Sequence, residues 1–177
     1  MEYPDLSALP VELQEVVTSY GSLNVFRMLM HSPSLAPGVL TLGDAVLQHN
    51  SLPDTLRELA IVRVGRVYGA AYEVHHHENI SRLVGLGEEA ITAAETGSPG
   101  KLSGPEAAVL AATDQLLARH TLDEATREEL LAFLTVNQLA DLVVTVGFYQ
   151  LMCGFLNTFE VTTEGEPSAP YGEVPPR

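Results

Sequence analysis

Apolar side chains recur along most of the chain at the three- and four-residue spacing of a helix with one buried face. This spacing marks a helix that begins near Val11 and further helices over about 24–31, 35–49, 54–67, 72–84, 88–96, 104–120, 123–135 and 138–157. Strand signals are weak, because alternating Val, Ile and Thr runs are scarce and neither Asn-Gly nor Asp-Gly occurs. The pattern therefore predicts an all-α fold of roughly eight helices with short connections.

The segment 54–67 differs from the other predicted helices, because apolar residues surround much of its circumference. A helix of this kind is expected deep in the core. Glu58 is the acid that interrupts the apolar stretch Leu56–Ile61. It either faces solvent beside Arg57 or points inward, where it must be paired or protonated because a bare buried carboxylate is too costly. Periodicity leaves both orientations open.

A length of 177 residues fits one domain, and 46% hydrophobic residues are enough for a real core. We expect a single domain over 1–177, with residues 1–20 as an N-terminal extension. The tail 162–177 is rich in Pro, Gly and Glu. It is expected to be loosely ordered or to lie across a partner subunit.

The chain is strongly acidic, with 9 Lys plus Arg against 23 Asp plus Glu and a formal net charge of −14. Nucleic acids and anionic membranes attract cationic surfaces, so neither is expected as a partner. The longest apolar run, 139–155, is interrupted by Asp141, Gln150 and two glycines. It is interpreted as a buried helix rather than a membrane span.

Cys153 is the only cysteine. A single thiol excludes an intramolecular disulfide, a CxxC redox pair and a zinc or iron–sulfur site with several cysteines. The acidic N-terminus lacks the cationic and apolar regions of a signal peptide, so the expected location is the cytoplasm.

Three consecutive histidines follow a tyrosine and a glutamate in the segment Tyr72–His77. On a helix, Glu73 and His77 share a face one turn apart, with His76 beside them. A carboxylate one turn before an imidazole can hold one tautomer and raise the basicity of the ring. This spacing therefore allows a proton relay.

Two other interpretations of the same residues stay open. A Glu–His pair at this spacing on an exposed helix face is often only a solvated ion pair of small energy. Glu73-Val74-His75-His76 also has the Glu-x-x-His form of carboxylate-bridged di-iron bundles. That design needs a second copy and two more carboxylates, and the chain has no second copy, so no metal is expected.

The central motifs resemble the carboxymuconolactone decarboxylase family, which includes the alkylhydroperoxidase D (AhpD)-like proteins. The resemblance is carried by Leu56-Arg57-Glu58-Leu59, Tyr72-Glu73-Val74-His75-His76-His77, Leu83-Val84-Gly85-Leu86 and Glu88-Glu89. Flanking blocks at 24–33, 112–116 and 147–157 extend it over roughly residues 20–160. It implies an AhpD-like bundle with an antiparallel helical core. It also implies a homo-oligomer, with a trimer or hexamer expected first and a dimer as the alternative.

The resemblance also implies site residues. AhpD-like peroxidases use a glutamate, a CxxC pair and two histidines as a proton relay that activates a thiol. In this chain the relay glutamate falls on Glu58 and the distal histidine on His77. The cysteines fall on Ala70 and Glu73, and the intervening histidine falls on Tyr72. Both thiols are missing, so reduction of peroxides by a dithiol is not expected.

Glutamate followed four residues later by histidine also resembles the decarboxylase branch, which works without metal or organic cofactor. We therefore expect a cofactor-independent lyase or isomerase that acts on a small carbonyl- or carboxylate-bearing substrate, in aromatic catabolism or a biosynthetic pathway. His77 is the expected general acid or base, oriented by Glu58 or Glu73, and Tyr72 is the expected hydrogen-bond donor to a developing enolate.

His76, Arg66 and Tyr149 are the candidate substrate-binding residues. Arg66 belongs to a group of four arginines between residues 57 and 82. A guanidinium near the pocket could anchor a carboxylate, although surface ion pairs explain such arginines equally well. Two alternatives to the enzyme are a non-catalytic small-molecule-binding protein with this fold and a peroxidase-like activity without the CxxC pair.

Overall fold

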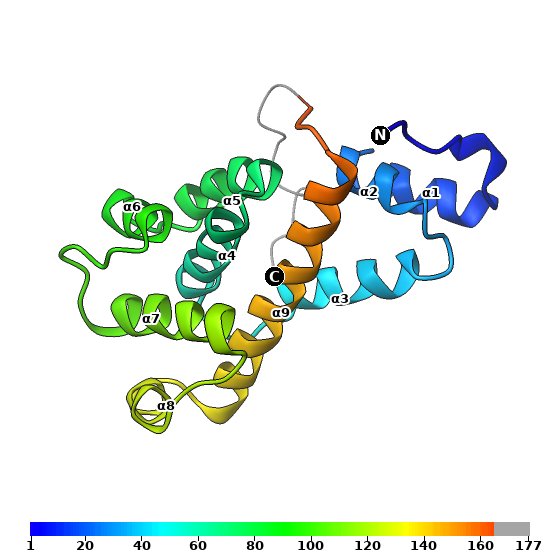
Figure 1. Cartoon of the computed structure of the whole chain (residues 1–177). Helices are drawn as coiled ribbons and strands as arrows, with labels where there is room; N and C mark the ends of the chain where they lie inside the picture. Colours follow the sequence, from blue (N-terminus) through cyan, green and yellow to red (C-terminus); the bar gives the residue numbers. More distant parts are fainter. Residues whose placement is uncertain (165–177) are drawn as a thin grey trace.

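The computed structural model describes residues 1–164, and within that range it is all-helical (Figure 1). Its elements are η1 (Leu6–Ala8), α1 (Val11–Ser19), α2 (Asn24–Leu29), α3 (Ala36–Gln48), α4 (Asp54–Tyr68), α5 (Ala71–Leu83), α6 (Glu88–Thr96), α7 (Gly104–Arg119), α8 (Glu124–Leu131) and α9 (Val136–Phe159). The predicted all-α class is confirmed. The described residues hold nine α-helices and one 3-10 helix where roughly eight helices were expected.

One predicted boundary was wrong, because the helix expected over 123–135 ends at Leu131. Thr135 instead begins the next helix. Its side chain accepts a hydrogen bond from the Gln138 backbone N–H, and the Gln138 side chain accepts one from the Thr135 backbone N–H. This reciprocal capping box satisfies two backbone donors that the first turn leaves without partners, so α9 starts at Val136.

Helix α4 lies at the centre of the fold and packs against α5, α6, α7 and α9. Its residues 57–62 are all buried, including Arg57 and Glu58. The predicted deep position of this helix is therefore confirmed. Because α4 is enclosed by neighbours, a polar side chain on it must find its partners inside the protein.

Two glycines allow α5 to follow α4 closely. Gly69 ends α4 in the left-handed conformation, with φ of +62°. At Gly65 an added Cβ would lie 3.0 Å from Cγ2 of Val74 and 3.5 Å from Cβ of Glu73. The missing side chain therefore lets α5 approach α4 beside Glu73.

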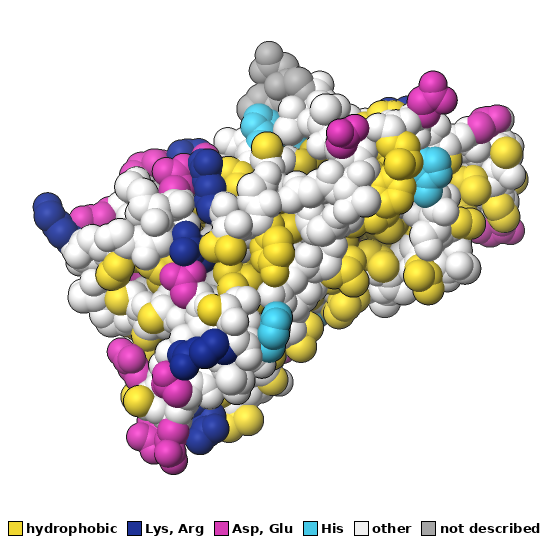
Figure 2. Space-filling model, viewed as in Figure 1, with side chains coloured by type: hydrophobic (Ala, Val, Ile, Leu, Met, Phe, Trp, Pro, Cys, Tyr) yellow, Lys and Arg dark blue, Asp and Glu magenta, His cyan; other side chains and the backbone are white. Residues whose placement is uncertain are grey.

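Helix α9 contributes one buried face to the core, formed by Leu142, Val146, Tyr149, Met152, Cys153 and Leu156 among others. By length and composition it is the one helix among the described residues that could cross a membrane. Its buried face is that of a core helix, as predicted. The opposite side exposes Val143, Val144 and Leu151, and Figure 2 shows apolar side chains gathered over the middle of this view.

The two ends of the described chain pack onto the helices rather than extending from them. Val17 of the N-terminal extension is buried, and the Tyr20 hydroxyl donates a hydrogen bond to Asp44 of α3. Beyond α9, the Asn24 side chain donates to the Thr162 carbonyl at 2.9 Å. Of the tail predicted to be loosely ordered, residues 165–177 lie outside the described part of the chain.

Candidate active site

Glu58 of α4 and His77 of α5 form a buried pair at the centre of the molecule. Glu58 Oε2 lies 2.7 Å from His77 Nδ1, and the exposed fraction of both residues is 0%. The inward orientation of Glu58, one of the two that the sequence allowed, is therefore the observed one. The solvated ion-pair interpretation of His77 is wrong, because the imidazole has no contact with solvent.

The hydrogen bonds around His77 assign a role to each ring nitrogen. An ionised carboxylate only accepts hydrogen bonds, so Nδ1 must carry the proton that it donates to Glu58. The other nitrogen, Nε2, lies 3.0 Å from the Tyr149 hydroxyl and 3.4 Å from Glu73 Oε2. Nε2 is therefore the ring nitrogen that is placed to exchange a proton, on the side of the ring that Glu73 and Tyr149 share.

Arg57 completes the environment of Glu58. Its Nε donates to Glu58 Oε1 at 3.1 Å, while its Nη1 donates to Asp54 Oδ1 at 2.6 Å. Both oxygens of Glu58 thus have a partner, which is the condition for keeping a carboxylate buried. The alternative in which Glu58 faces solvent beside Arg57 is not the observed one, since only 6% of Arg57 is exposed.

Burial and neighbouring charges shift the pKa values of His77 and Glu73, which face each other at Nε2. Burial by itself lowers the pKa of His77, but the Glu58 carboxylate, its hydrogen bond and Glu73 outweigh burial and raise this pKa. Burial also raises the pKa of Glu73; His77 opposes this shift and Glu58 adds to it. Both groups therefore hold a proton to higher pH than usual, and they can exchange it across 3.4 Å.

The raised pKa of Glu73 predicts a pH-dependent stability. The unfolded chain releases this proton near the ordinary pKa of 4.5, whereas the folded chain retains it to higher pH. The free energy of unfolding therefore loses a contribution as pH rises above about 4.5. Glu73→Gln removes this loss, so the variant should become more stable relative to wild type between pH 4.5 and pH 8, measured by urea unfolding.

Glu88→Gln is the matched control for this measurement. Its hydrogen bond with Arg82 lowers the pKa of the exposed Glu88, so the sign is opposite. The stability that this hydrogen bond contributes is lost as pH falls below about 4.5, so the difference between this variant and wild type should stay nearly constant from pH 4.5 to pH 8. A Glu73→Gln difference that does not change with pH would contradict the assignment of a raised pKa.

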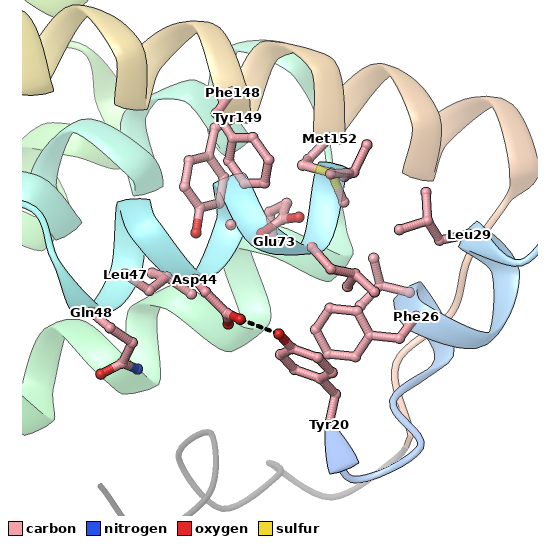
Figure 3. Close-up of a pocket in the computed structure, with 14 residues that line it drawn as sticks. Tyr20, Phe26, Leu29, Asp44, Leu47, Gln48, Glu73, Phe148, Tyr149 and Met152 are labelled. Carbon is pink, nitrogen blue, oxygen red and sulfur yellow. Dashed lines mark hydrogen bonds between the residues drawn. The ribbon is translucent and has the colours of Figure 1, made fainter. Parts of the chain in front are cut away.

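A pocket lies beside Glu73 and Tyr149 and holds about 580 Å³ of space, part of it open to solvent. Its apolar wall comes from Val25, Phe26 and Leu29 of α2, Val39, Leu40 and Leu47 of α3, and Phe148 and Met152 of α9. In Figure 3 the Glu73 carboxyl and the Tyr149 ring lie on one side of this space and the Tyr20–Asp44 pair on the other. Glu73 thus connects the buried His77–Glu58 pair with the pocket.

Tyr72 and His76 do not line this pocket with Glu73. Their side chains lie on another face of α5 and both meet Glu164. The Tyr72 hydroxyl donates to Glu164 Oε1 at 2.9 Å, and His76 Nε2 lies 3.2 Å from Glu164 Oε2. Helical geometry explains the separation, since five residues from Tyr72 to His77 rotate the side chain by about 140°.

Arg66 lies at the surface, where its Nη2 donates to Glu78 and Glu95. It does not line the pocket beside Glu73. Arg63 pairs with Asp114, and Arg82 pairs with Glu88. Of the four arginines between 57 and 82, Arg57 is the one that contacts the His77–Glu58 site. The structure thus brings Glu58, Glu73, His77 and Tyr149 together and leaves Tyr72, His76 and Arg66 apart from them.

Cys153 is buried on α9, one turn beyond Tyr149. Burial, and then the nearby Glu73 charge, raise the pKa of its thiol. A thiol is nucleophilic as the thiolate, so this environment opposes the chemistry of a peroxidase.

Sequence reasoning missed the pocket wall and the role of Arg57. No local sequence pattern marks Asp44, Tyr20 or Gly43 as pocket residues. They line the pocket only because segments that are distant in the sequence meet in the fold. The position of Arg57 could have been noticed in the sequence, because it adjoins the acid of the most apolar predicted helix. A buried carboxylate needs a cation or donors, and a neighbouring arginine supplies both.

The comparisons with known proteins agree with this fold. Residues 33–115 match the model of the carboxymuconolactone decarboxylase family. No curated protein matches the chain significantly.

Three solved structures are similar in fold. An uncharacterised peroxidase-related protein with an alkylhydroperoxidase AhpD core, from Ralstonia eutropha JMP134, has a TM-score of 0.78 at 22% identity, over 93% of this chain and 92% of that one. An uncharacterised peroxidase-related protein from Silicibacter sp. TM1040 has a TM-score of 0.76 at 16% identity, over 93% of this chain and 91% of that one.

The third structure is a protein of unknown function from Agrobacterium tumefaciens, suggested to be the antioxidant defence protein AhpD. It has a TM-score of 0.70 at 22% identity, over 78% of this chain and 96% of that one. These likenesses show the fold. The match over 33–115 makes this chain similar to the carboxymuconolactone decarboxylase family, and its helical fold is AhpD-like.

Proposed function

We propose that this protein is a cofactor-independent acid/base enzyme of the lyase or isomerase type, acting on a small carbonyl- or carboxylate-bearing substrate. The observation that carries the proposal is the buried chain Glu58–His77, which ends at Nε2 beside Tyr149 and Glu73. Glu73 and Tyr149 also line an apolar pocket. A titratable group with a raised pKa at the wall of a pocket is typical of general acid/base catalysis.

The proposed step is proton transfer next to a carbonyl group. With the shared proton on His77, the Glu73 carboxylate takes a proton from the carbon beside the carbonyl, and the C–H electron pair forms an enolate. The Tyr149 hydroxyl donates a hydrogen bond to the enolate oxygen. Glu73 then returns the proton to the same carbon or, in an isomerisation, to another one. In a decarboxylation, the electron pair of the broken C–C bond forms the enolate, and protonated Glu73 supplies the proton.

The proposal assigns different roles to the residues of the chain. Glu73 and Tyr149 are the catalytic residues, because they line the pocket. His77 exchanges a proton with Glu73, and Glu58 is a positioning residue that fixes the tautomer of His77. Tyr149 thus has the role expected of Tyr72, because Tyr72 is engaged with Glu164 and does not line the pocket beside Glu73.

Deuterium exchange tests the proposal with simple carbonyl compounds in place of the natural substrate. The protein is incubated in D₂O with a panel of small ketones and lactones, and ¹H NMR follows the loss of protons beside the carbonyl. We expect catalysed exchange for at least one compound, and its absence from Glu73→Gln. Saturable binding of these compounds without exchange would instead support a non-catalytic binding protein.

We also propose that the chain forms a homo-oligomer, with a trimer or hexamer expected before a dimer. Val143, Val144 and Leu151 expose apolar side chains along one helix, α9, and Val67 and Tyr68 do so at the end of α4. An exposed apolar face of this kind is typical of a contact between proteins. A stable monomer at micromolar concentration in light scattering would contradict the proposal.

A further inference from the structure

The charges around the pocket bear on which substrates it can hold. Two carboxyl groups, Asp44 and Glu73, line the pocket. Among the residues that the structure describes, no lysine, arginine or histidine lines it. Arg57 is held by Glu58 and Asp54, and Arg66 is held by Glu78 and Glu95. A carboxylate substrate would therefore find no cation at the pocket wall.

The two acids lie at opposite sides of the pocket, and this position disfavours an anion between them. Glu73 is buried at the inner end beside Tyr149, and Asp44 is half-buried at the opposite side, where it accepts the Tyr20 hydroxyl hydrogen bond (Figure 3). An anion between them would lose its hydration shell and face the Asp44 carboxylate on one side, and it would face a second like charge whenever Glu73 is ionised. Like charges in a poorly hydrated space disfavour each other strongly. The net charge of −14 adds repulsion from the rest of the chain.

The polar groups of the inner end suit an uncharged acceptor instead. The Tyr149 hydroxyl is a donor, and Glu73 becomes a donor when it holds its proton. The raised pKa of Glu73 favours that protonated form. A carbonyl oxygen can accept from either group without bringing charge into the pocket.

The apolar walls of the pocket favour a ligand that is largely apolar apart from its hydrogen-bond acceptor. Phe26 of α2, Leu40 of α3 and Met152 of α9 line the pocket together with the two acids. Gly43 adds room, because a Cβ there would lie 3.2 Å from Cζ of Phe148, closer than an ordinary contact. The space that Gly43 leaves therefore belongs to the pocket, and its width depends on the missing side chain.

We propose that this pocket binds an uncharged, largely apolar molecule with one hydrogen-bond acceptor, of the ketone, ester or lactone class, in preference to a carboxylate anion. The inference rests on the proposed function in taking the pocket beside Glu73 and Tyr149 as the substrate site. It narrows the substrate from carbonyl- or carboxylate-bearing compounds to the neutral class.

Isothermal titration calorimetry with probes of similar shape and different charge tests this inference at pH 7.5. The probes are acetophenone and methyl benzoate, which are neutral, and benzoate, which is an anion. We expect the neutral probes to bind about tenfold more tightly than benzoate or better, which corresponds to about 1.4 kcal/mol. Asp44→Asn should reduce this preference, because it removes one charge and keeps an acceptor for Tyr20.

Gly43→Ala should weaken binding of the neutral probes, because its methyl group lies against Phe148. This glycine has ordinary helical backbone angles, so alanine should not disturb α3. Benzoate binding as tight as that of the neutral probes, or no saturable binding of a neutral probe, would overturn the inference. Calorimetry reports binding alone, so neutral selectivity without deuterium exchange would contradict the proposed function and leave this inference standing.

Discussion

Replacing Glu58 with alanine is expected to destabilise the folded protein by about 3–5 kcal/mol, because it removes one partner of a fully buried ion pair. His77 would keep a buried Nδ1 donor without an acceptor, and Arg57 would lose its buried carboxylate partner. Glu58→Gln should cost less, since an amide oxygen can still accept the hydrogen bond of His77. Urea unfolding followed by circular dichroism measures these differences.

Glu88→Ala is the control for this prediction. Glu88 is exposed and pairs with Arg82 at the surface, so its loss should leave the unfolding midpoint almost unchanged. If Glu58→Ala unfolds at the same urea concentration as Glu88→Ala, the Glu58–His77 pair does not have the energetic weight that its burial indicates.

His77→Gln is expected to lower the rate of deuterium exchange by about 10²–10⁴-fold, which is the usual contribution of a positioned acid/base group. Glutamine has a similar length and can still donate a hydrogen bond to Glu58, but it cannot take up a proton from Glu73. The loss should therefore appear in turnover, with the fold retained in the circular dichroism spectrum.

His120→Gln provides the matched comparison, since His120 is exposed at the end of α7. It should retain the wild-type exchange rate. Full exchange activity in His77→Gln would remove His77 from the mechanism and leave Glu73 as a base that acts alone. Tyr149→Phe separates the two neighbours of Nε2, because it removes the hydrogen bond to the enolate and keeps the proton path from His77 to Glu73.

The positions of Glu73, His76 and His77 could be predicted only in part from their spacing in the sequence. The four-residue spacing of Glu73 and His77 predicts that they share one face of a helix, and their atoms do approach to 3.4 Å. The helical spacing also predicts that His76 lies beside them. His76 lies on the Glu164 side instead, because a three-residue step and a four-residue step fall on opposite sides of the helix face.

By itself, the sequence determined the helices, the central place of α4 and the lack of a vicinal thiol pair, because each depends on residue type and local periodicity. The tertiary structure decided three further points. It turned Glu58 inward, brought Tyr149 to His77 from 72 residues away, and built a pocket with two acids and no cation among its described lining residues. A helix that is apolar all round does not indicate which way its lone acid points. Contacts between helices that are distant in the sequence depend on how the side chains pack, and local residue spacing does not predict that packing.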